Sequence, residues 1–474
     1  MTNQFEENFN ILNNLIDPDL PNLLYIIHEF LEEGKDFGGT SLHLRDLLSV
    51  VKERYNCFVF YFNKAGYDLC YIGKETVKFS FVCDKPADTS QFDEQYKTLF
   101  SDVLKLFNID TVHIHQVINH SLDVFYCAKE AGCALYATVH DFYYLCPTLF
   151  MLNLKDEYCE IYGKDCGNCL EKRLGCRLDL IEYQTNSCKA LECCDAVFAP
   201  SEFAKKEYNK IFPRLDITII EHGCDYAAVI KKEKSSGDFK VAFVGAFSVK
   251  KGSGLIAQIV KKAKGFTPYL YGVMYDTKLS ALGKHYVFKG KYNRLELGSI
   301  LANDGIDAVC ILSRLPETYC CTLSEVIPAG VPVVVLDIGA LNRAKSIGGC
   351  VLLKSGVNAD DIIQTIKGLK ANKEKYDELC SSISNVKLKS VKEMADEYLS
   401  IYSKDAREKA VDYSLLTLYS RLFMHLGTAL QESQEALNSP YWKVCRYIGD
   451  KRFFKKTIRE RVERYYLKKK GTGE

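Results

Sequence analysis

The residues best suited to chemistry are two glutamates, Glu317 and Glu325, at the ends of a loop that contains two cysteines. They follow an apolar run at residues 308–312, which has the length of a buried strand. In an open α/β sheet, ligands bind at the carboxyl ends of strands, and the next helix offers unpaired N–H groups to a phosphate. The segment therefore predicts a site for a nucleotide diphosphate.

A second interpretation of the same residues is purely structural. Thr322-Leu323-Ser324-Glu325 also has the spacing of a capping box, in which Glu325 would accept a hydrogen bond from the Thr322 backbone N–H. A cap alone does not require a second carboxylate at Glu317 or cysteines in the loop. We therefore favour the functional interpretation.

Short apolar runs alternate with amphipathic stretches along most of the chain, which favours parallel sheets covered by helices. We expect a first set of strands at 23–28, 58–62, 112–115, 135–139 and 196–199. After a polar stretch at 231–237, a second set is expected at 240–244, 269–271, 287–289, 308–312 and 332–336. The predicted fold is α/β, with two Rossmann-like α/β/α domains.

The predicted domain boundaries follow from this alternation. Residues 1–20 form an N-terminal extension, 21–234 the first Rossmann-like domain with a cysteine-rich loop at 146–176, and 235–405 the second. Residues 406–474 form a helical, basic extension.

The order of several motifs resembles glycosyltransferase family 4, a family of retaining enzymes with the GT-B fold. Two glutamates separated by seven residues and followed by Ala329-Gly330-Val331-Pro332-Val333 are similar to its donor-site motif. Four other segments match in order along the chain: Gly38-Gly39-Thr40-Ser41, Thr138-Val139-His140-Asp141, Ala199-Pro200-Ser201 and Glu221-His222-Gly223-Cys224-Asp225. The resemblance implies two domains that face each other across a cleft, with the nucleotide on the second domain and the acceptor on the first.

The resemblance also implies roles for individual residues. Glu325 would bind the nucleotide ribose, and Glu317 would hold the transferred sugar. The pyrophosphate would contact peptide N–H groups at Cys321, Thr322 and Leu323. His140 would touch the donor sugar, and the loop at Gly39 would let backbone approach the phosphate closely. Taken alone, such a histidine is more often an ordinary half-buried residue than a ligand-binding one.

A glycine loop from Val244 to Gly252 is similar to the phosphate loop of the family's second domain. It contains Gly245 and Lys251, and the resemblance implies that Lys251 neutralises the leaving diphosphate. Ala246 stands where many members of the family carry an arginine, so one expected positive charge is missing. The loop lacks the spacing of a P-loop or of a dinucleotide fingerprint, which disfavours an ATPase or a dehydrogenase. Lysine and backbone N–H groups predict transfer without a catalytic metal.

Five cysteines, at Cys146, Cys159, Cys166, Cys169 and Cys176, lie within a short polar region. Cys166 and Cys169 have the two-residue spacer of a zinc knuckle. A structural zinc ion held by this cluster is one interpretation, and free core or loop thiols are the other. A zinc-dependent nucleic-acid module is disfavoured because lysine and arginine are not concentrated there.

Composition predicts a cytoplasmic protein. The first twenty residues lack the pattern of a signal peptide, no apolar run is long enough to span a membrane, and twenty cysteines fit a reducing compartment. A net charge of +1 argues against broad nucleic-acid binding.

The charge is uneven, however, because residues 439–474 are rich in lysine and arginine interleaved with aromatic residues. This mixture suits the headgroup region of an anionic membrane, such as the inner face of the plasma membrane. A solvated helix that packs its aromatic residues on the body explains it equally well.

Together these features predict a glycosyltransferase that moves a sugar from a nucleotide-diphosphate donor to a glycan or lipid-linked glycan, with retention of configuration. Cell-surface polysaccharide synthesis is the expected setting. Because Ala246 replaces the usual arginine, the alternative is a non-catalytic protein of the same fold that binds nucleotide sugars or glycans.

Overall fold

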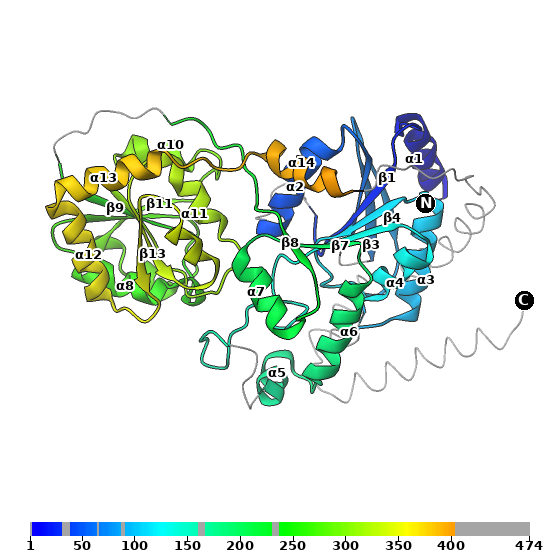
Figure 1. Ribbon diagram of the computed structural model, residues 1–474, viewed down its shortest axis with the longest axis horizontal. Coiled ribbons are helices and arrows are strands. Elements are labelled where there is room, and N and C mark those ends of the chain that lie inside the picture. Colours follow the sequence, from blue (N-terminus) through cyan, green and yellow to red (C-terminus); the bar gives the residue numbers. More distant parts are fainter. Residues whose placement is uncertain are drawn as a thin grey trace, which may run out of the picture. The chain divides into compact units, whose positions relative to one another are not determined.

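The computed structural model describes residues 2–30, 38–63, 66–86, 91–159, 166–229 and 237–402 (Figure 1). Internal contacts divide the chain into two units, residues 1–10 with 412–474, and residues 11–411. Both sheets belong to the second unit. The predicted basic extension, 406–474, and the predicted domain boundary between 234 and 235 lie outside the described residues. Within the described ranges, no helix has the length and apolar character needed to cross a bilayer.

The first sheet has eight strands in the order β4-β3-β2-β1-β5-β6-β7-β8. Strands β1, β2 and β5 to β8 run parallel, whereas β2, β3 and β4 pair antiparallel at one edge. The strands are β1 (Asn22–Ile26), β2 (Asn56–Phe62), β3 (Tyr67–Ile72), β4 (Thr76–Phe81), β5 (Thr111–Ile114), β6 (Ala134–Thr138), β7 (Ala196–Ala199) and β8 (Ile217–Ile219). The helices of this part are α1 (Thr2–Leu15), α2 (Gly39–Val51), α3 (Glu94–Leu106), α4 (Asp123–Glu130), α5 (Cys166–Leu174), α6 (Leu180–Glu192) and α7 (Glu202–Ile211).

The second sheet has six parallel strands in the order β11-β10-β9-β12-β13-β14. They are β9 (Lys240–Val244), β10 (Thr267–Tyr271), β11 (Val287–Gly290), β12 (Ala308–Ile311), β13 (Val333–Asp337) and β14 (Cys350–Lys354). The connecting elements are η1 (Val249–Lys251), α8 (Ser253–Lys262), α9 (Thr277–Ser280), η2 (Gly283–His285), α10 (Leu297–Asp304), α11 (Cys321–Val326), η3 (Ile327–Ala329), η4 (Gly339–Lys345), α12 (Ala359–Ala371) and α13 (Lys373–Ser384).

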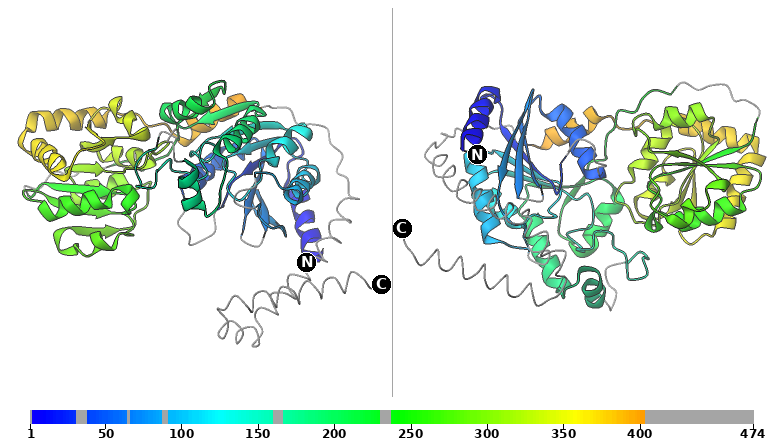
Figure 2. Two further views of the ribbon diagram at one scale, coloured as in Figure 1. Left: turned by 90° about the horizontal axis from the view of Figure 1, so that it is seen from below. Right: turned by 180° about the vertical axis from the view of Figure 1, so that it is seen from behind.

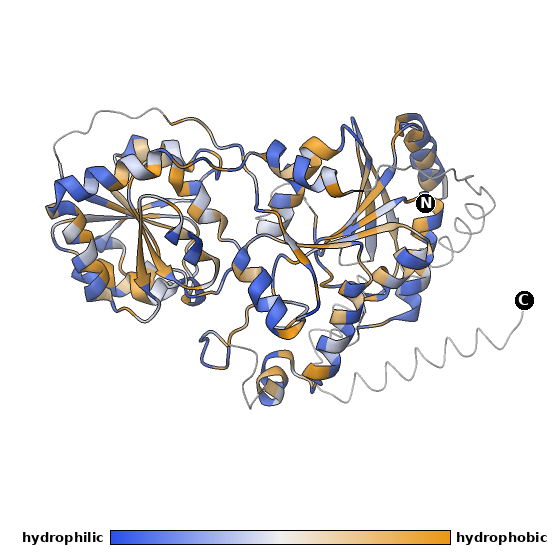
Figure 3. Cartoon of the chain, in the orientation of Figure 1, coloured by the Kyte–Doolittle hydropathy of each residue, from blue (hydrophilic) through white to orange (hydrophobic). Residues whose placement is uncertain are grey.

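The central strands of the second sheet, β9, β12 and β13, are buried on both faces, as their continuous apolar sequences require, whereas the edge strands β11 and β14 are partly exposed. In β9, Val241 and Phe243 join a core with α8 and α12, whereas Ala242 and Val244 join a core with α10 and α11. Figure 2 shows the helices around this sheet from two further sides, and Figure 3 shows the apolar residues concentrated on its strands. The predicted pair of Rossmann-like domains is confirmed.

The last described helix, α14 (Val391–Ile401), packs on the first sheet although it follows the second in sequence. Its apolar face and Tyr402 join the core formed by β1, β2 and α2. Ser390 caps the helix in a capping box with Glu393. The predicted second domain, residues 235–405, thus ends with a helix that belongs structurally to the first.

Candidate active site

Two adjoining cavities lie where loops of the first and second sheets meet. Their volumes are about 390 Å³ and about 460 Å³, within the range of small-molecule sites. Both are lined by Lys251, Glu317 and Glu325 from the second sheet and by Leu42 from the first. The carboxyl ends of parallel strands therefore surround the space, as expected for an α/β protein that binds a ligand.

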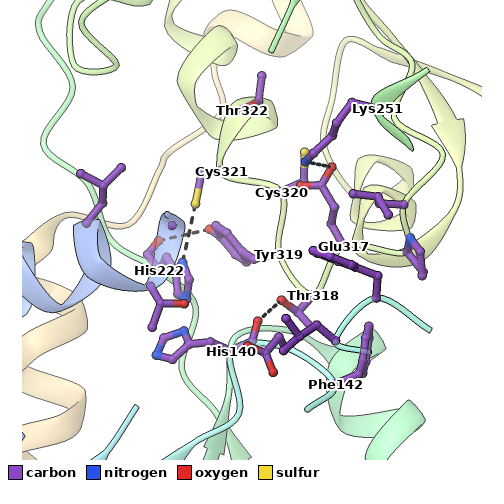
Figure 4. Close-up of a pocket in the computed structure, with 18 of the residues that line it drawn as sticks. His140, Phe142, His222, Lys251, Glu317, Thr318, Tyr319, Cys320, Cys321 and Thr322 are labelled. Carbon is purple, nitrogen blue, oxygen red and sulfur yellow. Dashed lines mark hydrogen bonds and ion pairs between the residues drawn. The ribbon is translucent and has the colours of Figure 1, made fainter. Parts of the chain in front are cut away.

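Most of the residues selected from sequence line these cavities. His140, Gly39 and Cys321 line the smaller cavity, Gly245 lines the larger, and Lys251, Glu317, Thr322 and Glu325 line both. Figure 4 shows Lys251, Glu317, Cys321 and His140 around the smaller cavity. Leu323 is the exception: its side chain is fully buried in the core, and its N–H donates to the Cys320 carbonyl at 3.1 Å. The prediction that its N–H contacts pyrophosphate is therefore not supported by this geometry.

Lys251 and Glu317 form an ion pair, with 2.8 Å between Nζ and Oε1. Lys251 ends the short helix η1, and the next residue, Gly252, has φ +85° and lies against the Leu312 carbonyl. A side chain at position 252 would collide with that carbonyl, so glycine is required to place Lys251 here.

Both members of this pair are charged. Burial alone would raise the pKa of Glu317, but the adjacent Lys251 charge and hydrogen bonds from Lys251 and Ser313 lower that pKa overall. Burial alone would lower the pKa of Lys251, and the Glu317 charge raises it overall. The ammonium group therefore stays positive at neutral pH in the wall shared by both cavities.

Glu325 has a different environment. It lies on α11, is 6% exposed, and accepts a hydrogen bond from the Tyr292 hydroxyl at 3.3 Å. Burial raises the pKa of Glu325 to about 7, although the Arg294 charge opposes that rise. The capping-box alternative is wrong: the helix begins at Cys321, its N-cap is Cys320 without a side-chain cap, and Thr322 lies inside the first turn.

Arg343, which the sequence did not single out, holds the loop between the two glutamates. Its guanidinium lies 4.3 Å from the Tyr319 ring centroid and donates to the carbonyls of Tyr319 and Cys320, both at 3.2 Å. It also donates to Ser324 Oγ at 2.7 Å. No local pattern indicates this role, because Arg343 is far from the loop in sequence and comes from η4.

The same loop is hydrogen-bonded to the first domain. Ser201 Oγ donates to the Thr318 carbonyl, Thr318 Oγ1 donates to the His140 carbonyl, and Tyr319 donates to the His222 carbonyl at 3.1 Å. Figure 4 shows the last two of these bonds. The motifs at Ser201, His140 and His222 thus meet the glutamate loop, although they are far apart in sequence.

On the first-domain side of the smaller cavity, the ionisable groups are neutral or easily neutralised. Burial, together with neighbouring histidines, lowers the pKa of His140 well below its ordinary value. Burial raises the pKa of Asp141 to about 6, despite hydrogen bonds from Tyr143 and Gln116. His140 is therefore a neutral imidazole at physiological pH.

The positive charge missing at Ala246 has neighbours that can replace it. Lys291 and Arg294 line the same 460 Å³ cavity as Ala246. Arg294 is ion-paired with Asp46 of α2, which orients its guanidinium at the wall. Both residues follow β11, and no sequence motif singled them out.

The five cysteines of the predicted zinc cluster are all described, and burial, together with the nearby Cys159 and Cys169 thiols, raises the pKa of Cys146. Cys146 forms a hydrogen bond with Thr148 at 3.1 Å, and none of the described cysteines belongs to a set with metal-ligand spacing. Residues 160–165, between Cys159 and Cys166, lie outside the described ranges. Structural zinc at Cys146, Cys159, Cys166, Cys169 and Cys176 stays a prediction.

Comparison with protein families agrees with the geometry. Residues 37–228 match the model of the family described as Glycosyltransferase Family 4. The predicted resemblance to this family is confirmed over these residues. No curated protein matches the chain significantly.

Solved structures with the same fold cover both sheets. Anabaena HepE in complex with UDP-glucose is 16% identical, with a TM-score of 0.53, over 80% of this chain and 99% of that chain. Sucrose-phosphate synthase from Thermosynechococcus elongatus is 11% identical, with a TM-score of 0.53, over 86% and 100%. The catalytic domain of starch synthase IV from Arabidopsis thaliana, bound to ADP and acarbose, is 12% identical, with a TM-score of 0.51, over 81% and 98%. This chain has the GT-B fold.

Proposed function

We propose that this protein is a glycosyltransferase that moves a sugar from a nucleotide-diphosphate donor to a hydroxyl group of a glycan. The observation that carries the proposal is the wall shared by the two cavities, where Lys251, Glu317 and Glu325 face the same space. One cavity has room for the nucleotide, and the other for the sugar and the acceptor. The family match over residues 37–228 supports the same class of reaction.

In this proposal the larger cavity holds the nucleotide diphosphate. Lys251, Lys291 and Arg294 give it three cationic side chains, which suit the charge that develops on a leaving diphosphate. Glu325 accepts from the ribose hydroxyls when it is ionised. Because these groups belong to the protein, the reaction needs no catalytic metal.

The smaller cavity holds the transferred sugar and the acceptor. Glu317 and the neutral His140 ring face it, and both can form hydrogen bonds with sugar hydroxyls. Glu317 is held by Lys251, so it is poorly suited to attack the sugar as a nucleophile. We therefore propose transfer with retention through attack from the face that the diphosphate leaves, without a glycosyl-enzyme intermediate.

The ligands of related structures indicate which nucleobases of the donor to test first. HepE was solved with UDP and with UDP-glucose, and starch synthase IV with ADP. Uridine and adenosine diphosphate sugars are therefore the first donors to test.

We also propose that the acceptor is a glycan, free or lipid-linked, used in cell-surface polysaccharide synthesis. The basis is the aromatic and basic sequence of residues 439–474, which suits a peripheral anchor on an anionic membrane. Removal of 439–474 should abolish sedimentation with anionic vesicles and preserve turnover on a short soluble acceptor. Unchanged sedimentation would contradict the anchor.

The second candidate function is non-catalytic binding of nucleotide sugars. It is motivated by Ala246 and by the ion pair between Lys251 and Glu317, which occupies both side chains without ligand. Such a protein would bind donors without releasing a nucleoside diphosphate.

The test is a panel of UDP-sugars and ADP-sugars, with donor binding measured by thermal shift and nucleoside diphosphate release measured with and without glycan acceptors. The proposal expects acceptor-dependent release that falls strongly in Glu325→Ala. Glu378→Ala, which removes an exposed carboxylate on α13, is the matched control and should keep full activity. Binding without any release would favour the non-catalytic alternative, and neither binding nor release would reject both.

A further inference from the structure

Five of the nine histidines in the chain gather at one place in the first domain. They lie in or just after β5, β6 and β8 and on α2: His43, His113, His115 and His140 are buried, and His222 is half-buried. The ring centroids of His43 lie 5.5 Å from His115, 4.8 Å from His140 and 4.4 Å from His222. The function proposed above uses only His140, so the other rings need another explanation.

Two buried histidines of this domain show what a structural role requires. His113 bonds through one ring nitrogen to the Tyr402 hydroxyl at 2.5 Å and through the other to Thr138 Oγ1 at 2.8 Å. His120 bonds to the Tyr96 hydroxyl at 2.6 Å and to the Ile27 carbonyl at 2.9 Å. Each ring therefore has a partner for both nitrogens, as buried polar groups usually do.

His43, His115 and His140 do not follow that rule. Both ring nitrogens of His43 are buried without a partner, as are Nε2 of His115 and Nδ1 of His140. Their rings are only 4%, 1% and 8% exposed. With Nε2 of His222 the cluster holds five such atoms. A buried polar atom without a partner is costly, so the His43 ring, unpartnered at both nitrogens, indicates a partner that is not a protein group.

The three rings have the spacing of metal ligands. Among the described residues they are the set of histidine, cysteine and acidic side chains whose ligand atoms all lie within 4.8 Å of one another. Nitrogens around one tetrahedral zinc ion, each about 2.1 Å from the metal, are about 3.4 Å apart. Ring rotations that move atoms by about 1 Å would close the site. The metal would replace the hydrogen bond of 2.8 Å between His115 Nδ1 and His140 Nε2 and would take one of the two unpartnered nitrogens of His43 as its third ligand.

We propose that His43, His115 and His140 form a binding site for a divalent transition-metal ion of the zinc class. Three imidazole ligands suit zinc, copper or nickel and do not suit magnesium or calcium, which prefer oxygen. The nearby Arg294 charge is compensated by its ion pair with Asp46. Because His140 lines the 390 Å³ cavity, a fourth position on the metal can face that cavity and take water.

The effect of the metal on transfer rests on the proposed function. A metal bound to His140 removes the lone pair with which this residue would contact the donor sugar. Zinc should therefore inhibit the enzyme, whereas zinc binding itself does not depend on any transferase activity.

The experiment measures zinc binding and thermal stability on the full chain, first stripped with chelator. Zinc at one to five equivalents should raise the melting temperature of the wild-type protein by about 2–4 °C. His43→Leu should lose this rise and one bound zinc per chain. Because the substitution removes two unpartnered buried nitrogens, the metal-free variant should fold and melt no lower than the wild type. His115→Asn should lose the same zinc and gives a second test from another ligand.

Two control variants keep the result specific. His285→Leu removes a histidine on η2 outside the cluster, and Cys166→Ser removes a thiol of the predicted cysteine site; both should keep the zinc-dependent rise. The proposal fails if wild-type protein shows no zinc-dependent rise, or if the rise survives in both His43→Leu and His115→Asn. It also fails if the rise disappears in Cys166→Ser, because thiolates would then be the ligands.

Discussion

The two sides of the candidate site satisfy their polar groups in different ways. On the second-domain side, Lys251 and Glu317 are charged and paired at 2.8 Å, and Arg343 is bonded to three groups of the loop. On the first-domain side, the ionisable rings are neutral, and His43 has no partner at either nitrogen. Charged groups in a poorly solvated site are costly unless they are paired, whereas neutral imidazoles can stay unpaired at a smaller cost.

This contrast indicates how each side can interact with a ligand. Under the proposed function, the charged side would change partners when a diphosphate binds, because Lys251 can exchange one anion for another. The neutral side offers lone pairs and N–H groups without first breaking an ion pair. The predictions below disturb first the charged side and then the neutral side.

The largest expected effect is on transfer in Lys251→Ala. Loss of the cation that faces the leaving diphosphate should lower the rate of transfer about 100-fold to 1000-fold. Steady-state nucleotide release, with folding checked by circular dichroism, measures the effect.

The same substitution removes the cationic partner of the half-buried Glu317, so stability should fall as well. The double variant Lys251→Ala/Glu317→Gln removes that unpaired charge and should recover stability without recovering activity. Lys250→Ala removes a lysine that lies over the Phe150 ring and should lower the rate less than about threefold. Equal losses in the Lys250 and Lys251 variants would remove Lys251 from its proposed role.

The next effect is the pH dependence of stability that Glu325 introduces. Its pKa in the folded protein is about 7, above the ordinary value of 4.5, so the folded state holds this proton more tightly than the unfolded chain. The stabilisation is complete below about pH 4.5 and is lost as pH rises through 7, by at most about 3 kcal/mol. In Glu325→Gln this part of the pH dependence should disappear. Urea unfolding at pH 5 and pH 8 measures the difference, and an unchanged difference in the variant would contradict the raised pKa.

A smaller effect tests the contrast within the neutral side. Tyr402→Phe removes the hydrogen bond to His113 and leaves that ring nitrogen as unpartnered as those of His43. The free energy of unfolding should fall by about 1–2 kcal/mol. Metal-free His43→Leu, by comparison, should show no loss. If both variants lose equal stability, the difference between partnered and unpartnered histidines has no energetic meaning.

The sequence was informative where the determinants are local. Continuous apolar runs predicted the first and last residues of β7 and β9 correctly. The spacing of Glu317 and Glu325 correctly indicated that both residues line the same cavity. Strand β4 was missed because it is an antiparallel edge strand that alternates buried and exposed residues and so gives no continuous apolar run. Strand β3 was missed although it is buried, because Asp68 interrupts its apolar sequence.

Long-range contacts could not be predicted in the same way. Helix α14 has clear capping and periodicity, but nothing local says that it returns to the first sheet. Arg343 and His43 reach the site only through tertiary packing. The spacing of His113 in β5 and His115 directly after it was the one local signal of the histidine cluster, because residues two apart in an extended chain face the same side.

The smallest expected effect is that of metal removal on transfer. The larger cavity already has the cations Lys251, Lys291 and Arg294 at its wall, so the leaving diphosphate has protein groups to neutralise it. Stripping the protein with excess chelator should therefore leave the rate of transfer within about twofold of its initial value, since the dominant electrostatic groups are unchanged.

If the rate of transfer rises slightly, zinc at His43, His115 and His140 was inhibiting, and added zinc should reverse the rise in the wild type but not in His43→Leu. Activity that is lost on chelation and restored only by magnesium or manganese would assign the diphosphate to a metal instead. The protein cations of the charged side would then be insufficient to bind the diphosphate, and the proposed contrast between the two sides would be wrong.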